Sequence, residues 1–145
     1  MTREERELLA KDLCARLPYR VKVHVGNLKS PYEMVGMHSG WVIITTEVGD
    51  DYYDLSKVKP YLRPLSSITS AEKSELELMG FRYENGSIIN EDVTEYDDYR
   101  NHPYTWVDET KCFEIIEFLN SHHFDYMGLI EKGLALEAEK DTYKS

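Results

Sequence analysis

The stretch that decides the fold is Arg20-Val-Lys-Val-His-Val25, in which apolar and polar residues alternate. The two-residue period of a strand places the three valines on one face and Lys22 and His24 on the other. Two further extended runs follow, Tyr32–His38 and the β-branched Trp41–Thr46, and turn residues separate all three runs. The sequence therefore predicts a small, curved antiparallel sheet.

A helix is predicted before this sheet. Thr2 followed by Glu5 forms a capping-box pattern, and leucines then recur at helical spacing until Pro18 ends the run. After the three extended runs, a short strand at 51–54 and one helical turn at 55–58 are expected. This order of elements also suits a small barrel of the Src-homology type.

The chain is predicted to consist of two parts, 1–65 and 66–145, that share one core in an α+β protein. Between them, Lys59–Pro64 contains two prolines that each remove a hydrogen-bond donor. We therefore expect a rigid, extended connector there rather than a helix.

The second part is predicted to be helical with one β-hairpin. Thr69 begins a short helix that Gly80 ends, and Asn85-Gly86 is a strong hairpin motif. A wide apolar stripe predicts a core helix over Asp108–Asn120. The segment from Phe124 to Leu136 is expected to form a short helix that packs back on the body, with the last residues frayed.

Charge is divided unevenly between the two parts. Up to Leu65 there are ten Lys or Arg and nine Asp or Glu, a net charge of +1. From Ser66 there are seven and eighteen, a net charge of −11, so the two parts sum to the net charge of −10. A surface of this kind repels phosphate backbones and favours cationic partners.

Tyrosines lie among the densest carboxylates of the acidic part. Tyr and Trp offer large contact areas at low entropic cost, so they often anchor recognition surfaces. We therefore predict a non-enzymatic protein that binds a partner with a basic surface. The predicted interaction surface comprises Glu84, Glu91, Asp92, Glu95, Tyr96, Asp97, Asp98, Tyr99, Tyr104 and Trp106.

A second hypothesis is an enzyme that uses His122, His123 and Asp125, with one histidine as a general base oriented by the aspartate. The competing structural interpretation places both histidines just past the end of the last helix, where the helix dipole favours charged histidine. We favour the structural interpretation because no nucleophile or further ligand stands nearby in sequence. No catalytic residue is therefore predicted.

A third hypothesis is a nucleic-acid adaptor that uses the N-terminal sheet. Lys22, Lys57, Lys59 and Arg63 would form a local basic patch on that sheet. The net charge of −10 argues against tight binding of this kind.

No metal or cofactor is predicted. Asp50-Asp51 with Asp54 copies a spacing that holds magnesium on helices, but it follows Gly49 at a turn between strands. The chain also lacks a Gly-rich phosphate loop and a Gly-x-Ser-x-Gly turn.

The composition is that of a folded protein, with 41% hydrophobic and 12% aromatic residues. A charged start and the absence of a long apolar stretch predict a cytoplasmic protein without a membrane segment. Cys14 and Cys112 each fall on the expected apolar face of a helix, where free thiols are commonly buried. The sequence leaves the oligomeric state and the partner's identity open.

Three blocks resemble a group of small uncharacterised proteins carried by prophages and other mobile elements of gut anaerobic bacteria. They are Lys11-Asp-Leu-Cys-Ala-Arg-Leu-Pro-Tyr19, Lys59-Pro-Tyr-Leu-Arg-Pro-Leu-Ser-Ser67, and Phe124-Asp-Tyr126 continuing to Gly128-Leu-Ile-Glu-Lys-Gly-Leu-Ala-Leu136. The resemblance implies an intracellular, phage-associated setting. It assigns no catalytic or binding residue.

Overall fold

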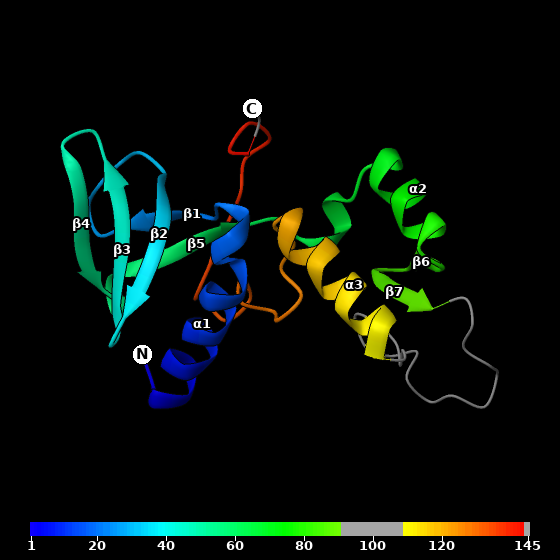
Figure 1. The fold of residues 1–145 in the computed structure, drawn as a ribbon, viewed down its shortest axis with the longest axis horizontal. Coiled ribbons are helices and arrows are strands. Elements are labelled where there is room, and N and C mark those ends of the chain that lie inside the picture. The colour runs from blue at the N-terminus through cyan, green and yellow to red at the C-terminus, as the bar shows by residue number, and fades with distance from the viewer. Residues whose placement is uncertain (91–108, 144–145) are drawn as a thin grey trace. The chain divides into compact units, whose positions relative to one another are not determined.

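The computed structural model of the chain describes residues 1–90 and 109–143. The chain divides into two compact units (Figure 1). Unit 1 comprises Met1–Arg63 together with Asn120–Ser145, and unit 2 comprises Pro64–Leu119. The last part of the chain therefore groups with the N-terminal residues of unit 1 rather than with helix α2 (Ser70–Leu78) and the hairpin of unit 2.

Unit 1 begins with helix α1 (Arg3–Arg16), and its predicted capping box is confirmed. The Thr2 hydroxyl accepts from the Glu5 backbone N–H at 3.1 Å, and the Glu5 carboxylate accepts from the Thr2 N–H at 2.8 Å. Leu9 and Leu13 are fully buried. Cys14, which was expected on this buried face, is exposed because Leu9, Asp12, Leu13 and Arg16 occupy it.

A six-stranded sheet follows, with the strand order β4-β3-β2-β1-β5-β8. Neighbouring strands are antiparallel except β5 and β8, so the sheet is mixed rather than purely antiparallel. Within the described residues it does not close into a barrel. The strands are β1 (Lys22–Val25), β2 (Tyr32–His38), β3 (Trp41–Thr46), β4 (Gly49–Asp54), β5 (Val58–Leu62) and β8 (Leu136–Glu137).

The alternation predicted for the first strand is confirmed. Val21, Val23 and Val25 are fully buried, whereas Lys22 and His24 are only half-buried. The strand β2 is irregular, because its register with β3 shifts between Met34 and Gly36. Such an extra residue bends the strand and increases its twist.

The segment Lys59–Pro64 is extended as predicted over Lys59–Leu62, but this part is not a connector, because Val58–Leu62 forms β5 inside the sheet. Gly26 N–H donates to the Lys57 carbonyl at 3.0 Å, so hydrogen-bonded pairs alternate from there along the β1–β5 ladder. Val23 and Pro60 face each other between two hydrogen-bonded pairs, so no ladder hydrogen bond joins these two residues. The N–H that Pro60 lacks is therefore not needed by this ladder.

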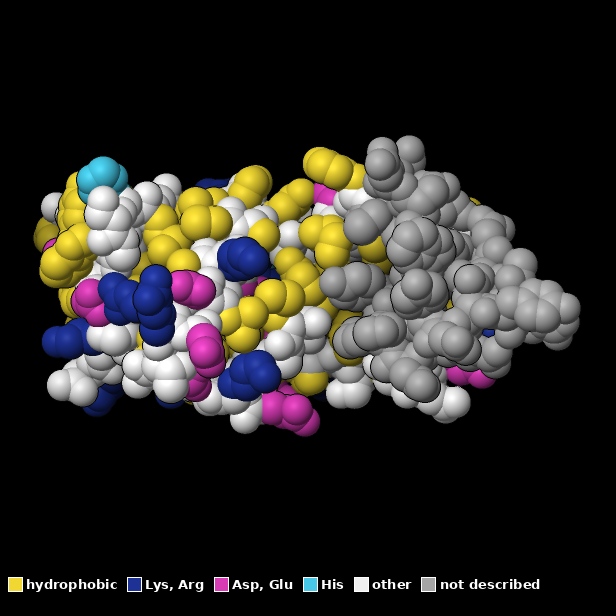
Figure 2. Space-filling view, turned by 90° about the horizontal axis from the view of Figure 1, so that it is seen from below, with side chains coloured by type: hydrophobic (Ala, Val, Ile, Leu, Met, Phe, Trp, Pro, Cys, Tyr) yellow, Lys and Arg dark blue, Asp and Glu magenta, His cyan; other side chains and the backbone are white. Residues whose placement is uncertain are grey.

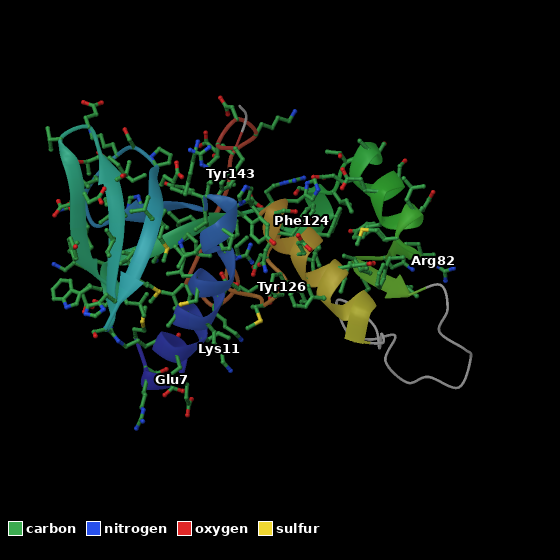
Figure 3. The ribbon with its side chains drawn as sticks, viewed as in Figure 1. Glu7, Lys11, Arg82, Phe124, Tyr126 and Tyr143 are labelled. Carbon is green, nitrogen blue, oxygen red and sulfur yellow. The ribbon has the colours of Figure 1, made fainter. Side chains whose placement is uncertain are left out.

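The short helix expected from Phe124 to Leu136 is also wrong. This segment consists of turns, and it ends in β8, which pairs in parallel with Tyr61 and Leu62. Tyr143 lies near the chain end (Figure 3) and is not frayed: its hydroxyl donates to the Tyr61 carbonyl at 2.6 Å and accepts from the Lys22 N–H at 2.9 Å. Partners distant in sequence thus hold the C-terminal segment in place.

The core of unit 1 contains a buried ion pair. Arg16 is 0% exposed and binds the Asp12 carboxylate at 2.7 and 3.1 Å. Its guanidinium also donates to the Phe124 carbonyl at 2.6 Å and lies 5.1 Å from the centre of the Tyr126 ring. Burial raises the pKa of Asp12, and Arg16 opposes this shift. One arginine therefore links α1 to the C-terminal segment.

Unit 2 contains the predicted helices and hairpin. Helix α2 (Ser70–Leu78) has the capping box of Thr69 and Glu72, and Gly80 follows with a left-handed φ of 88°. Strands β6 (Phe81–Glu84) and β7 (Ser87–Asn90) pair across Asn85-Gly86, as predicted. Helix α3 (Glu109–Ser121) runs to the end of unit 2, and its last two residues belong to unit 1.

The apolar stripe of α3 is narrower than predicted. Ile115, Phe118 and Leu119 are buried, but Phe113 is 76% exposed and Ile116 is half-buried. Across residues 1–90 and 109–143, no helix has the length and apolar character needed to cross a membrane.

Candidate functional site

Large apolar side chains are exposed on the β2–β4 meander of unit 1. Val35 is 46%, Trp41 48%, Tyr52 57% and Val48 98% exposed. Figure 2 shows hydrophobic side chains at the end of unit 1 where these three strands lie. An exposed apolar patch with a polar rim marks an interaction site.

The sheet register explains how this surface is built. Gly36, Ile43 and Tyr52 lie opposite one another on β2, β3 and β4, so the side chains of Ile43 and Tyr52 share a face. A Cβ atom placed on Gly36 would lie 3.3 Å from Ile43 Cδ1, so the isoleucine side chain covers the glycine. Trp41 lies two residues before Ile43 and therefore shares its face, whereas Val42 is buried on the opposite face.

The same segment is acidic. No Lys or Arg occurs from Ser30 to Ser56, whereas five carboxylates do. Two of them form ion pairs with arginines outside this segment: Glu33 with Arg20 at 2.9 Å and Asp54 with Arg6 at 3.2 Å. The other three form no ion pair with any residue that the structure describes; they are Glu47, Asp50 and Asp51.

We call this surface the acidic aromatic face and define it by Trp41, Ile43, Glu47, Asp50 and Tyr52. Asp51 lies opposite the buried Ile44 and therefore projects from the other face of β4. Asp50 accepts a hydrogen bond from the Thr45 hydroxyl at 2.8 Å, and Asp51 accepts one from the Tyr53 hydroxyl at 3.1 Å. β4 is the outermost strand of the sheet, and carboxylates on an edge strand oppose pairing with an identical edge. The carboxylates of β4 therefore oppose edge-to-edge pairing with a second copy of the chain.

Sequence reasoning missed this face because it averaged charge over the first 65 residues. The net charge of +1 conceals a stretch without any basic residue, flanked by Lys29 and Lys57. A count over a shorter window would have found the stretch. The exposure of Trp41 and Tyr52 could only come from the sheet register.

The interaction surface predicted from sequence is described at one residue only. Glu84 is exposed at the end of β6, and its carboxylate lies 3.0 Å from Arg82 Nε. The other predicted residues lie outside the described residues; they are Glu91, Asp92, Glu95, Tyr96, Asp97, Asp98, Tyr99, Tyr104 and Trp106.

The structure separates the roles of the two histidines and Asp125. The His123 ring stacks on Tyr143 with their centres 3.5 Å apart. Arg63 donates to the His122 backbone carbonyl at 3.2 Å. Both oxygens of Asp125 accept backbone N–H groups, from Leu129 at 2.9 Å and Ile130 at 3.0 Å. The Asp125 carboxylate thus orders the turn that follows it, which favours the structural interpretation.

The charge state expected for this histidine pair is wrong for His123. Burial lowers the pKa of His123 to about 4, and the nearby positive charge of Arg16 acts in the same direction. His123 is therefore neutral at pH 7 and is not the charged histidine that a helix C-terminus would favour.

The four residues of the predicted basic patch fall into two groups. Lys22 Nζ donates to the Thr142 carbonyl at 2.7 Å, and the Arg63 guanidinium lies 4.3 Å from the centre of the Phe124 ring. Both therefore bind the C-terminal segment. Lys57 and Lys59 instead line one pocket with His24.

The aspartates at 50, 51 and 54 do not converge on one point. The Arg6 guanidinium and Ser56 hold the pKa of Asp54 well below its ordinary value. Within residues 1–90 and 109–143, no group of three or more His, Cys, Asp or Glu side chains is placed to hold a metal ion.

Comparisons with known proteins found no matching family model, no similar curated protein and no similar solved structure.

Proposed function

We propose that this chain is a non-enzymatic accessory protein of a phage or other mobile element, and that it acts by binding a protein with a basic surface. The acidic aromatic face is the observation that carries this proposal. It combines two exposed aromatic rings with two carboxylates, Glu47 and Asp50, that lack a basic partner among the described residues.

The rings and the charges contribute to binding in different ways. Trp41 and Tyr52 are about half exposed on a regular sheet, so they are held rigidly and lose little entropy on binding. Asp50 on the same face and Glu47 in the adjoining turn attract cations and speed the encounter with a basic surface. The mobile-element setting comes from the sequence resemblance.

Unit 2 contains a second acidic region. Glu75, Glu77, Glu114 and Glu117 are exposed on α2 and α3. The tyrosine-rich segment 91–106, which lies outside the described residues, adds further carboxylates in the sequence. We propose this region as an additional contact for the same basic partner.

The test is affinity capture from a host-cell lysate, followed by binding kinetics on the captured protein. Asp50→Lys should slow association, and Trp41→Ala should speed dissociation by a factor equivalent to about 1 kcal/mol or more. Glu7→Lys is the matched control, because it makes the same charge change on an exposed position of α1 (Figure 3). Asp97→Lys and Tyr99→Ala test the second region in the same way.

Unchanged binding kinetics in the variants would contradict the proposal. If the unmodified protein, Asp50→Lys and Trp41→Ala bind the captured protein with equal rate constants, the acidic aromatic face is not the interface. Equal salt dependence of association for Asp50→Lys and Glu7→Lys would contradict the electrostatic part.

A further inference from the structure

A pocket of about 660 Å³ opens on unit 1 between the loop after β1 and the start of β5. Its polar lining comprises His24, Asn27, Ser56, Lys57 and Lys59, with no carboxylate. A pocket of this volume falls within the range of small-molecule sites, roughly 300–1,000 Å³. It does not include any residue of the acidic aromatic face.

The strand register fixes the basic groups on one side of the pocket. His24 of β1 lies directly opposite Lys59 of β5, so their side chains project from the same face of the sheet. Lys57 is the last residue of the 3-10 turn Leu55–Lys57 that precedes β5, and it lines the same pocket as Lys59. The Tyr61 ring packs edge-on against the His24 ring, and the Tyr61 hydroxyl lies 3.4 Å from His24 Nδ1.

The two lysines are unpaired, unlike the arginines of the same unit. Arg6, Arg16 and Arg20 each bind a carboxylate within 3.2 Å. Neither Lys57 nor Lys59 forms an ion pair with a residue that the structure describes. Two ammonium groups without counter-ions, in a chain of net charge −10, make this pocket a site for an anion.

The number of charges bears on the choice of anion. Lysine binds phosphate as a point charge, and two ammonium groups match the two negative charges of a phosphomonoester. The imidazole of His24 and the amide of Asn27 can add hydrogen bonds to phosphate oxygens. The donor set therefore suits a phosphate group carrying two negative charges.

Apolar groups complete the pocket. Leu28, Tyr53 and Leu136 lie on its wall. The Tyr53 hydroxyl donates a hydrogen bond to Asp51 at 3.1 Å, which fixes the position of the tyrosine ring. A ligand that fits both walls carries a phosphate beside a flat or apolar group.

We propose that this pocket binds a small phosphomonoester of mononucleotide size, with the phosphate held by Lys57 and Lys59. This site is independent of the proposed protein contact, because the two surfaces share no residue.

The test is a titration of the full chain followed by amide NMR, with adenosine 5′-monophosphate, adenosine and inorganic phosphate as separate probes. Adenosine 5′-monophosphate should give saturable shifts in residues 24–28 and 56–59, with higher affinity than adenosine or phosphate alone. Lys57→Gln and Lys59→Gln should each weaken its affinity by about tenfold or more, since each removes a charged hydrogen bond. Lys11→Gln, at an exposed position of α1 (Figure 3), should leave the affinity unchanged.

Several results would overturn the proposal. One is the absence of saturable shifts at the pocket, and another is an equal loss of affinity in Lys11→Gln. A third is tighter binding, through the same two lysines, of a single-stranded oligonucleotide without a terminal phosphate. The spectrum of each variant without ligand reports whether it is folded, so loss of the fold is distinguished from loss of the site.

Discussion

Arg16 and Asp12 are four residues apart on α1, a spacing typical of a solvent-exposed helix pair. Here both are buried and the pair is completed by the distant Phe124 carbonyl. Removing one partner of a buried pair leaves an uncompensated charge, so replacing either residue alone is expected to destabilise unit 1.

His123 leads to a prediction about pH. Its pKa is about 4 in the folded chain and near 6.5 in the unfolded chain, so the unfolded chain binds more protons between these values. The contribution of neutral His123 to stability is complete above pH 6.5 and is lost as the pH falls toward 4. The expected result is that His123→Phe, which retains a ring for Tyr143, weakens this pH dependence.

The measurement is the urea midpoint of both proteins at pH 4.5 and pH 7. His38→Gln, at an exposed histidine of β2, serves as the control and should follow the unmodified protein. An unchanged pH dependence in His123→Phe would show that other groups carry the acid sensitivity.

At the scale of elements, helix α3 shows how an apolar stripe can mislead. The stripe predicts that all its large side chains face the core, but the buried positions are Ile115, Phe118 and Leu119. Phe113 is 76% exposed although it lies in the same run. Spacing along a helix identifies a face, and only the neighbouring elements decide how wide the covered part of that face is.

Three truncations in α3 test this difference in burial. Ile115→Ala should lower the free energy of unfolding by about 2–5 kcal/mol, because it leaves a cavity around a fully buried site. Phe113→Ala should lower it by less than about 1 kcal/mol, since this ring is already largely in water. Ile116→Ala is expected between them because Ile116 is half-buried. Chemical denaturation of the three variants checks this order, and equal effects of Ile115→Ala and Phe113→Ala would refute it.

At the scale of the whole molecule, unit 1 is assembled from both ends of the chain. The chain leaves this unit at Arg63 and returns to it at Asn120. Leu129, Leu134 and Ala135 then join the core that α1 and the sheet begin. Closing such a long loop is unfavourable in entropy, so the contacts of the returning segment must offset that cost.

Tyr143 provides a test of this closure. Tyr143→Phe keeps the ring stacked on His123 but removes the hydroxyl that bonds Tyr61 and Lys22. The buried partners are left unsatisfied, so we expect a loss of about 1–3 kcal/mol in unfolding free energy. Tyr52→Phe, at a 57% exposed tyrosine, should change stability by less than about 0.5 kcal/mol. A comparable effect of the two changes would mean that the chain end does not contribute to the fold.

The sequence by itself determined the elements whose causes lie within a few residues. Thr2 with Glu5 and Thr69 with Glu72 start helices, and Asn85-Gly86 makes the hairpin. Each of these depends on hydrogen bonds or backbone angles that neighbouring residues satisfy. The alternation around Val23 is equally local, because the pleat of a strand sets it.

Only the tertiary structure decided the features whose partners are distant. Pro60 lies in a strand because its pairing position needs no N–H, and β8 exists because β5 offers it an edge. The neutrality of His123 follows from burial, and the pocket of Lys57 and Lys59 with His24 follows from strand register. The acidic aromatic face likewise required the register that sets Ile43 opposite Tyr52. These arrangements depend on which distant segments pack together, and the spacing of residues within one segment does not determine that.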